Sequence, residues 1–204
     1  MTGLRERKRQ RTHDTVSTIA VAMFLEHGYD RVSVADIAAA ADISKPTLFR
    51  YFRSKEDLVL HRFADHTGEA ARVVRARPPE RSPLGALLTH VLDGLSRRDP
   101  VTGLNDHPEV LRFHDLVFST PALSARVNDH VAGEVAELAA ALSPAAELTA
   151  RLAAAQIVAV QHLLARENWR CLSDGETADA RHPAAVADAE HAFDLLAGGL
   201  RAYA

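Results

Sequence analysis

The amino-acid sequence predicts an all-α fold of about nine helices. It divides into a three-helix domain over residues 1–54 and a larger helical domain over residues 55–204. Three observations predict this class. Hydrophobic residues make up 47% of the chain, which is enough for a buried core, while alanine is abundant and aromatic residues reach only 5%. No run of β-branched or aromatic residues alternates with polar ones, as a strand would require. Proline repeatedly follows Ser, Thr or His at positions that suit the first turn of a helix.

The first three helices are predicted from apolar spacing and from capping residues. Residues at three- and four-residue intervals form one face of the first helix: Val16, Ile19, Ala20, Met23 and Phe24. Gly28 is expected to end this helix as a left-handed cap. Ser33 is expected to cap a second helix and Ser44 a third, with the four-residue turn "ADIS" between them.

The remaining helices are predicted from serine caps and proline starts. A fourth helix is expected from Ser54 to about Arg77, ending at "RPPERSP". Five more are expected at about 83–98, 108–119, 121–142, 144–170 and 183–203. The segment "CLSDGETADARH" is expected to be a loop between the last two.

The charge is divided unevenly along the chain. Residues 1–55 hold ten Lys/Arg and six Asp/Glu, giving +4, whereas residues 56–204 hold fourteen and twenty-one, giving −7. A basic amino-terminal quarter on an acidic body favours a polyanion-binding head. The basic stretch from Arg5 to Arg11 is expected to track phosphates or a minor groove, or else to be a disordered, solubilising tail.

Several classes of site find no support in the sequence. Cys171 is the single cysteine, so neither a disulfide within the chain nor a cysteine cluster for zinc is expected. The histidines have no metal-ligand spacing, no catalytic motif is present, and we expect no metal, no cofactor and no enzyme activity. No apolar run approaches the length of a membrane span and no signal peptide is evident, so we expect a cytoplasmic protein without a membrane partner.

Two short helices joined by a four-residue turn describe a helix-turn-helix. The first helix and the turn are apolar, with Ile37, Ala38, Ala41 and Ile43 expected to pack against Leu48 and Phe52. The second helix would then direct polar and basic side chains outward. The alternative from the pattern alone is an ordinary helical hairpin with a solvated face.

The segment "GYDRVSVADIAAAADISKPTLFRYFRSKEDLV" resembles the DNA-binding segment of TetR-family transcriptional regulators, over about residues 12–60. The pairs Gly28-Tyr29, Leu48-Phe49 and Tyr51-Phe52, and the triplet Ser54-Lys55-Glu56, carry the resemblance. It implies a DNA-binding surface made of Ser33, Ser44, Lys45, Pro46, Thr47, Phe49, Arg50, Tyr51 and Lys55.

Individual positions of this implied surface differ in what they suggest. Arg50 occupies the variable position between the aromatic residues and is expected to read a base edge. Lys55 is expected to contact a phosphate, or alternatively to be a solvated charge at a helix start. Phe49 stands where the family often has tyrosine, and Pro46 where a small residue is common, so either departure is expected to alter the operator.

The resemblance also implies a homodimer that binds a small lipophilic effector. Two apolar stripes are expected to form a four-helix interface: Leu148, Leu152, Ala155, Val158 or Ala159, and Leu163 on one helix, and Val186, Ala189, Phe193, Leu196 and Leu200 on the other. The alternative is that both stripes complete the core of the monomer.

The effector pocket is expected between the middle helices. Its candidate lining residues, each alternatively plain core, are Phe63, Val91, Leu95, Phe113, Leu116, Val117, Phe118, Val131, His162 and Trp169. The leading hypothesis is therefore a ligand-responsive DNA-binding regulator, most simply a repressor of a palindromic operator. The second is a DNA-binding helical regulator controlled by a protein partner. The third, a helical enzyme or scaffold, is disfavoured by the charge split and the head motif.

Overall fold

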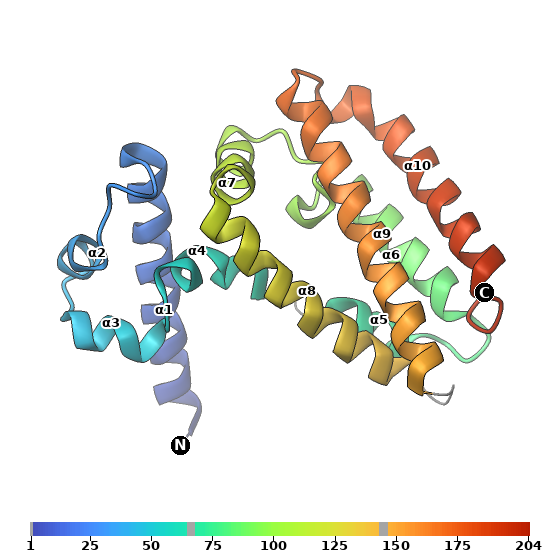
Figure 1. Cartoon of the computed structure of the whole chain (residues 1–204), viewed down its shortest axis with the longest axis horizontal. Coiled ribbons are helices and arrows are strands. Elements are labelled where there is room, and N and C mark those ends of the chain that lie inside the picture. Colours follow the sequence, from blue (N-terminus) through green and yellow to red (C-terminus); the bar gives the residue numbers. More distant parts are fainter. Residues whose placement is uncertain (1, 65–67, 143–146) are drawn as a thin grey trace. The chain divides into compact units, whose positions relative to one another are not determined.

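The computed structural model describes residues 2–64, 68–142 and 147–204, excluding the side chains of residues 2, 4–6, 8 and 61–64. Every regular element in these ranges is a helix (Figure 1). The elements are α1 (Thr2–His27), α2 (Val34–Ala40), α3 (Lys45–Tyr51), α4 (Lys55–Ala64), α5 (Glu69–Ala76), α6 (Pro83–Ser96), the 3-10 helix η1 (Pro100–Thr102), α7 (Pro108–Ser119), α8 (Pro121–Ala141), α9 (Glu147–Ser173) and α10 (Ala178–Gly199). The all-α prediction is confirmed.

The described residues form two compact units. The first, called the head here, comprises residues 2–64 and 112–128; the second, called the body, comprises residues 68–111, 129–142 and 147–204. The head therefore contains the end of α7 and the beginning of α8 as well as α1 to α4. The domain boundary expected after residue 54 separates a DNA-binding domain from a ligand-binding and dimerisation domain. It is a division by function, unlike these compact units, and it stays a prediction.

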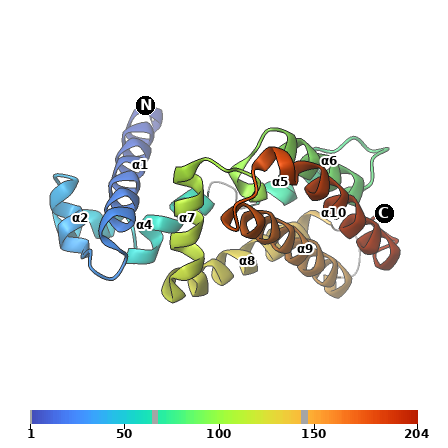
Figure 2. The same cartoon turned by 90° about the horizontal axis from the view of Figure 1, so that it is seen from above.

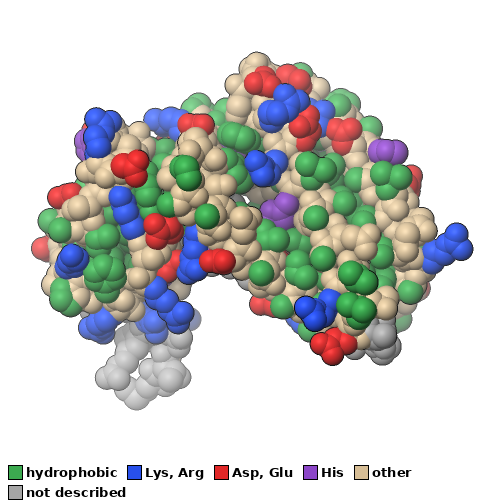
Figure 3. Space-filling model, viewed as in Figure 1, with side chains coloured by type: hydrophobic (Ala, Val, Ile, Leu, Met, Phe, Trp, Pro, Cys, Tyr) green, Lys and Arg blue, Asp and Glu red, His purple; other side chains and the backbone are tan. Residues whose placement is uncertain are grey.

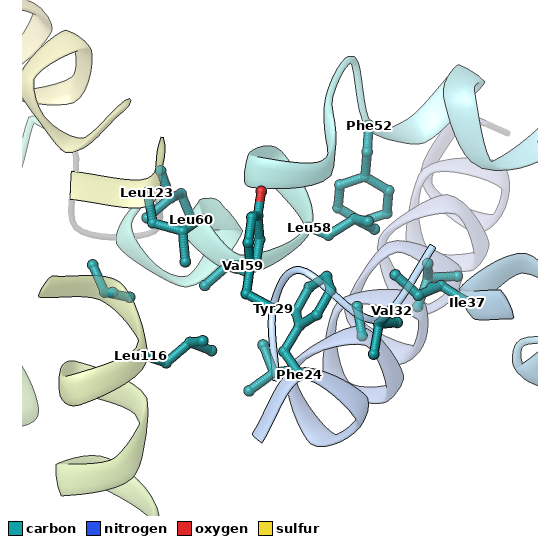
Figure 4. Close-up of a cluster of buried hydrophobic side chains, with 14 of the residues drawn as sticks. Phe24, Tyr29, Val32, Ile37, Phe52, Leu58, Val59, Leu60, Leu116 and Leu123 are labelled. Carbon is teal, nitrogen blue, oxygen red and sulfur yellow. The ribbon is translucent and has the colours of Figure 1, made fainter. Parts of the chain in front are cut away.

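The head is held together by one apolar cluster, to which α1, α2, α3, α4, α7 and α8 all contribute (Figure 4). Phe24 from α1 and Ile37 from α2 are buried there together with Leu58 from α4. The buried Ser17 hydroxyl donates a hydrogen bond to the carbonyl of Leu58 at 2.7 Å, which ties α1 to α4. The expected packing of the helix-turn-helix is confirmed, because Ile37 and Leu48 are fully buried in this cluster.

The body is built from longer helices, in which α10 packs against α6 and α9 (Figure 2). Ala153 and Ala154 on α9 are fully buried, and their small side chains allow neighbouring helices to approach closely. The buried Asn168 donates to the carbonyl of Thr102 and accepts from Arg181, so one side chain joins η1, α9 and α10. A buried amide with partners on both its oxygen and its nitrogen avoids the cost of unsatisfied burial.

The single helix predicted from Ser54 to about Arg77 is wrong, because two helices, α4 and α5, occupy this range. Gly68 precedes α5 with a φ of 75°, a left-handed conformation that a helix interior does not allow. A Cβ at this position would also lie 2.0 Å from Oε2 of Glu137 on α8. Glycine therefore suits this position, because a side chain would be strained by the positive φ and crowded by Glu137.

The start predicted for the last helix is also wrong. α10 begins at Ala178, and Pro183 lies inside it. Thr177 caps the helix by accepting a hydrogen bond from the amide of Ala180, and Asp106 accepts one from the amide of Ala178 at 2.8 Å. These two caps start the helix upstream of the proline, so the expected loop shortens to residues 174–177.

The two apolar stripes expected at a dimer interface lie in different environments. On α9, Leu148, Leu152 and Leu163 are exposed, as are Ala155 and Ala159, whereas Val158 is buried. On α10, Ala189, Phe193 and Leu196 are buried in the body, so this stripe completes the monomer core and its assignment to the interface is wrong. Leu195, the neighbouring residue, is the exposed large apolar side chain of α10.

By length and composition α9 is apolar enough to cross a membrane, which corrects the expectation that no segment approaches such a length. The core helix of a soluble protein passes the same test, and the alanine face of α9 is buried in the body. The finding is thus weak evidence for a membrane span.

Candidate nucleic-acid interface

Helix α3 presents the side chains that the sequence predicts for DNA, and two residues fix its orientation. Leu48 and the C-cap residue Phe52 are 0% and 1% exposed and hold α3 in the head cluster. Ser44 is the N-cap, and its hydroxyl oxygen accepts a hydrogen bond from the amide of Thr47 at 3.2 Å. Pro46 lies in the first turn, where the missing amide hydrogen costs no helical hydrogen bond.

The outward surface of α3 is basic and aromatic. Lys45, Pro46, Phe49 and Arg50 are exposed, with Phe49 45% accessible, and the Lys45 ammonium lies 6.0 Å from the centre of the Phe49 ring. The structure therefore brings these four predicted residues together on a helix of seven residues. The ammonium suits contact with a phosphate, and the aromatic ring suits apolar contact with a base.

Thr47 and Tyr51 are half-buried rather than fully outward. The Tyr51 ring meets the ring of His13 edge-on at 6.3 Å between centres, and the same His13 ring lies 4.0 Å from that of Phe52. Sequence reasoning missed His13. Its spacing in the sequence could have revealed it, because His13 lies one helical turn before Val16 and Ser17, on the face of α1 that becomes buried.

Helix α2 begins with a reciprocal cap at Ser33. The Ser33 hydroxyl accepts from the amide of Asp36 at 3.2 Å, and the Asp36 carboxylate accepts from the amide of Ser33 at 2.9 Å. Hydrogen bonds from Ser33 lower the pKa of Asp36. Asp42, in the turn between α2 and α3, has a φ of 52°, a left-handed conformation that aspartate tolerates better than most residues.

The Lys55 ammonium is engaged inside the head. It donates a hydrogen bond of 2.5 Å to the carbonyl of Tyr29, and it lies 4.1 Å from the centre of the Tyr29 ring and 5.3 Å from that of Phe24. The side chain is half-buried. The structure therefore gives Lys55 a role that neither sequence interpretation anticipated, which is to join the end of α1 to the start of α4. Its expected phosphate contact stays a prediction.

A second pair joins the same two points. The Tyr29 hydroxyl donates to Oε1 of Glu56 at 2.7 Å. Burial and then this hydrogen bond raise the pKa of Tyr29 well above its usual value. Burial alone would raise the pKa of Glu56, but hydrogen bonds from Tyr29, its own backbone and Ser54 together hold it below its usual value.

An ion pair attaches α8 to the first turn of α4. The guanidinium of Arg126 lies 3.2 Å from Oδ1 of Asp57. Leu123 from α8 is fully buried in the head cluster, which contains Leu58 and Leu60 as well. The beginning of α8 is thus fixed to the helix that follows the helix-turn-helix.

The ten residues predicted for an effector pocket are divided between several places. Phe113, Leu116, Val117 and Phe118 belong to the head cluster, Val91 and Val131 pack in the larger body cluster, and Leu95 is buried in the smaller one. His162 shares a hydrogen bond of 2.9 Å with Glu134, Trp169 is half-buried, and the side chain of Phe63 lies outside the described residues.

A separate surface groove of about 550 Å³ lies between α8 and α9. Figure 3 shows hydrophobic and charged side chains interspersed over one face of the molecule. Alanines from both helices line most of it, and Glu147 and Arg151 supply its charges. None of the ten predicted pocket residues lines this groove. Their assignment to a pocket stays a prediction.

The fold and the interface define an all-helical protein that displays a helix-turn-helix on a compact head. Residues 18–61 match the family model described as bacterial regulatory proteins, tetR family. Over 146 residues, 68% of this chain, the sequence is 32% identical to the HTH-type transcriptional regulator TcmR of Streptomyces glaucescens. The match spans 63% of TcmR, less than two thirds of its length.

Solved structures of similar fold include GusR of Salmonella enterica, with a TM-score of 0.59 at 18% identity, covering 94% of this chain and 96% of GusR. The SmeT–triclosan complex has a TM-score of 0.53 at 15% identity, covering 93% of this chain and 91% of SmeT. At such identities the structures show the fold alone. The family-model match and the identity to TcmR show that the chain belongs to the tetR family of bacterial regulatory proteins, a family of transcriptional regulators and not of enzymes.

Proposed function

We propose that this protein is a transcriptional regulator that binds a palindromic DNA operator as a homodimer, represses transcription there, and is released by a small lipophilic effector. The observation that carries the proposal is the outward face of α3, where Lys45, Phe49 and Arg50 are exposed on a helix held by buried Leu48 and Phe52. This arrangement gives a rigid reading surface, because the residues that anchor the helix are not those that face outward.

The chemistry of the three exposed side chains suits the major groove. Arg50 can donate two hydrogen bonds to O6 and N7 of guanine, which discriminates against a wrong base by about 1–3 kcal/mol. Phe49 lacks the hydroxyl that would bind a phosphate, but its ring suits the methyl group of thymine. Lys45 is placed for a phosphate, where a point charge gives affinity without base preference.

The dimer is supported by the leucines that α9 leaves exposed. Leu152 and Leu163 are 55% and 68% accessible and lie on the same stripe as Leu148. A second copy that covers this stripe would remove its apolar surface from water, and two-fold symmetry would present two copies of α3 about one helical turn of DNA apart. On α10 we propose that the exposed Leu195 contributes to the dimer interface. The stripe that contains Leu196 does not, because Leu196 is buried.

The effector is proposed by analogy with a neighbour of the same fold. SmeT is solved in complex with triclosan, a small lipophilic molecule. Release requires the effector to bind the DNA-incompetent dimer better than the DNA-bound one, with a coupling of about 1–3 kcal/mol. A cytoplasmic location follows from this function, because the operator is there.

Selection from a random duplex pool tests the DNA-binding part of the proposal. We expect enrichment of a two-fold symmetric site, weaker base preference at one position in each half-site for Arg50→Ala, and steep weakening with salt. Arg53→Ala is the control, because Arg53 is exposed but lies beyond the C-cap of α3. Recovery of unrelated or asymmetric sequences would refute the proposal.

The alternative, control by a protein partner without a small effector, is favoured by one observation. The predicted pocket residues Val117, Leu95 and Phe113 are buried in apolar clusters of two different units. Thermal shift of the purified protein against a panel of lipophilic compounds separates the two functions. A compound that stabilises the protein and releases the selected duplex supports the small effector, whereas release only by a cell extract's protein fraction supports the partner.

A further inference from the structure

The amino-terminal part of α1 carries arginines outside the core of the head. α1 starts at Thr2, whereas its first buried residue is Val16. Arg7, Arg9 and Arg11 are all exposed. The sequence left open whether this stretch is a phosphate-binding arm or a disordered tail; the structure continues it as a helix without interruption.

The helical extension carries an excess of positive charge, with five basic residues and one acidic residue, Glu6, from Arg5 to Arg11. Within the described part of the chain, no ion pair involves Arg7, Arg9 or Arg11, and the first turn contains no acidic residue. Arg7 and Arg11 are four residues apart, so they lie above one another on the helix and repel each other. An anionic partner would remove this repulsion, whereas solvent only screens it.

The position of the extension is fixed relative to α3 by His13. Its ring lies 4.0 Å from that of Phe52 between centres, tilted by 33°, and Phe52 is the C-cap of α3. The eleven residues of helix that precede His13 therefore run about 16 Å past this contact, at 1.5 Å per residue. Figure 1 shows the first turns of α1 continuing beyond α3 within the head.

We propose that the α1 extension is a second DNA-contacting surface, in which Arg7, Arg9 and Arg11 bind phosphates that flank the half-site read by α3. The inference rests on the proposed DNA-binding function. The contact is to the backbone and not inside the minor groove, because a helix about 10–12 Å across does not enter a groove about 6 Å wide. The extension therefore adds affinity and footprint without adding sequence preference.

The test replaces all three arginines with glutamine, a residue of similar helix propensity. The control, Arg97→Gln with Arg151→Gln and Arg201→Gln, removes the same charge from exposed positions of the body. Binding is measured against salt concentration for a random-sequence duplex and for a duplex enriched by selection. We expect the slope of log affinity against log salt to fall by about 0.9 for each phosphate contact that is lost.

Three outcomes decide the inference. A lower slope on both duplexes, with unchanged base preference and a footprint shortened at its flanks, supports it. A slope equal to that of the control variant overturns it, while binding of the selected duplex by the wild-type protein would leave the proposed function standing. A wild-type protein that binds no duplex overturns both.

A conservative variant guards against misfolding. Arg7→Lys with Arg9→Lys and Arg11→Lys keeps the charge and should retain the wild-type slope. If the lysine variant loses slope as the glutamine variant does, while its thermal unfolding is unchanged, charge on the extension is not what binds DNA and the inference fails.

Discussion

Replacing Lys55 with methionine should destabilise the head, although the sequence suggested either a phosphate contact or a solvated charge for this lysine. Methionine keeps most of the apolar stem and removes the ammonium. The ammonium donates to the carbonyl of Tyr29 at 2.5 Å and lies within 5.3 Å of the rings of Tyr29 and Phe24.

The expected loss follows from these contacts. A hydrogen bond with a charged partner contributes about 1.5–3 kcal/mol, and a cation over an exposed aromatic face about 0.5–1 kcal/mol. Water can reach the carbonyl after the substitution because the site is only half-buried, so we expect a net loss of about 2 kcal/mol. With a urea dependence of about 2 kcal/mol per molar, the unfolding midpoint of the head should fall by about 1 M.

The measurement has to report the head alone, since two compact units need not unfold together. Amide hydrogen exchange of Val21 and Phe24, both buried on α1, provides such a probe across a urea series. Lys45→Met is the matched control, because Lys45 is exposed and its nearest aromatic contact is 6.0 Å to the Phe49 ring. Equal stability of the two variants would refute the reasoning. It would show that Lys55 stabilises the head no more than the exposed Lys45 does.

Three further predictions follow from other parts of the molecule. Burial lowers the pKa of His114 to about 4 from its ordinary 6.5, so the head should lose about 3 kcal/mol of stability as pH falls through that window, and His114→Leu should remove this part of the pH dependence in acid titrations of unfolding. A wild-type slope equal to that of the variant would show that His114 is already charged or exposed. Leu152→Glu with Leu163→Glu should give folded monomers by sedimentation, whereas the exposed Val101→Glu should leave a dimer; a dimeric double variant would place the interface elsewhere. A compound that releases the selected duplex should bind more weakly when that duplex is saturating, by the same factor as it weakens DNA binding; equal affinities in the two titrations would exclude it as an inducer.

The starts of α3 and α6 were predicted correctly, whereas the start of α10 was not. Ser44 caps α3 as expected, because its capping hydrogen bond is made to an amide three residues later, and α6 starts at Pro83 as expected. The start predicted at Pro183 was wrong, because Thr177 and the distant Asp106 cap α10 upstream of this proline. The break before α5 was missed because the sequence does not reveal the positive φ of Gly68.

The candidate site divides in the same way. The exposed residues of α3 follow from local spacing, since Leu48 and Phe52 determine which face is turned inward. The engagement of Lys55 depends on a carbonyl 26 residues upstream, and no local pattern reveals it. On α10, periodicity correctly grouped Leu196 with Ala189 and Phe193, but it could not decide whether this stripe faces the core of the monomer or a second copy.

The separation of anchoring and outward residues on α3 has a consequence for how this protein can evolve. Positions 45, 46, 49 and 50 contribute exposed side chains, so substitutions there change the surface offered to DNA with little effect on the cluster that folds the head. A duplicated gene could therefore drift to a new operator through a series of folded intermediates. A substitution at Leu48 or Phe52 would instead destabilise the fold of the head at once, because both side chains are buried completely or nearly so.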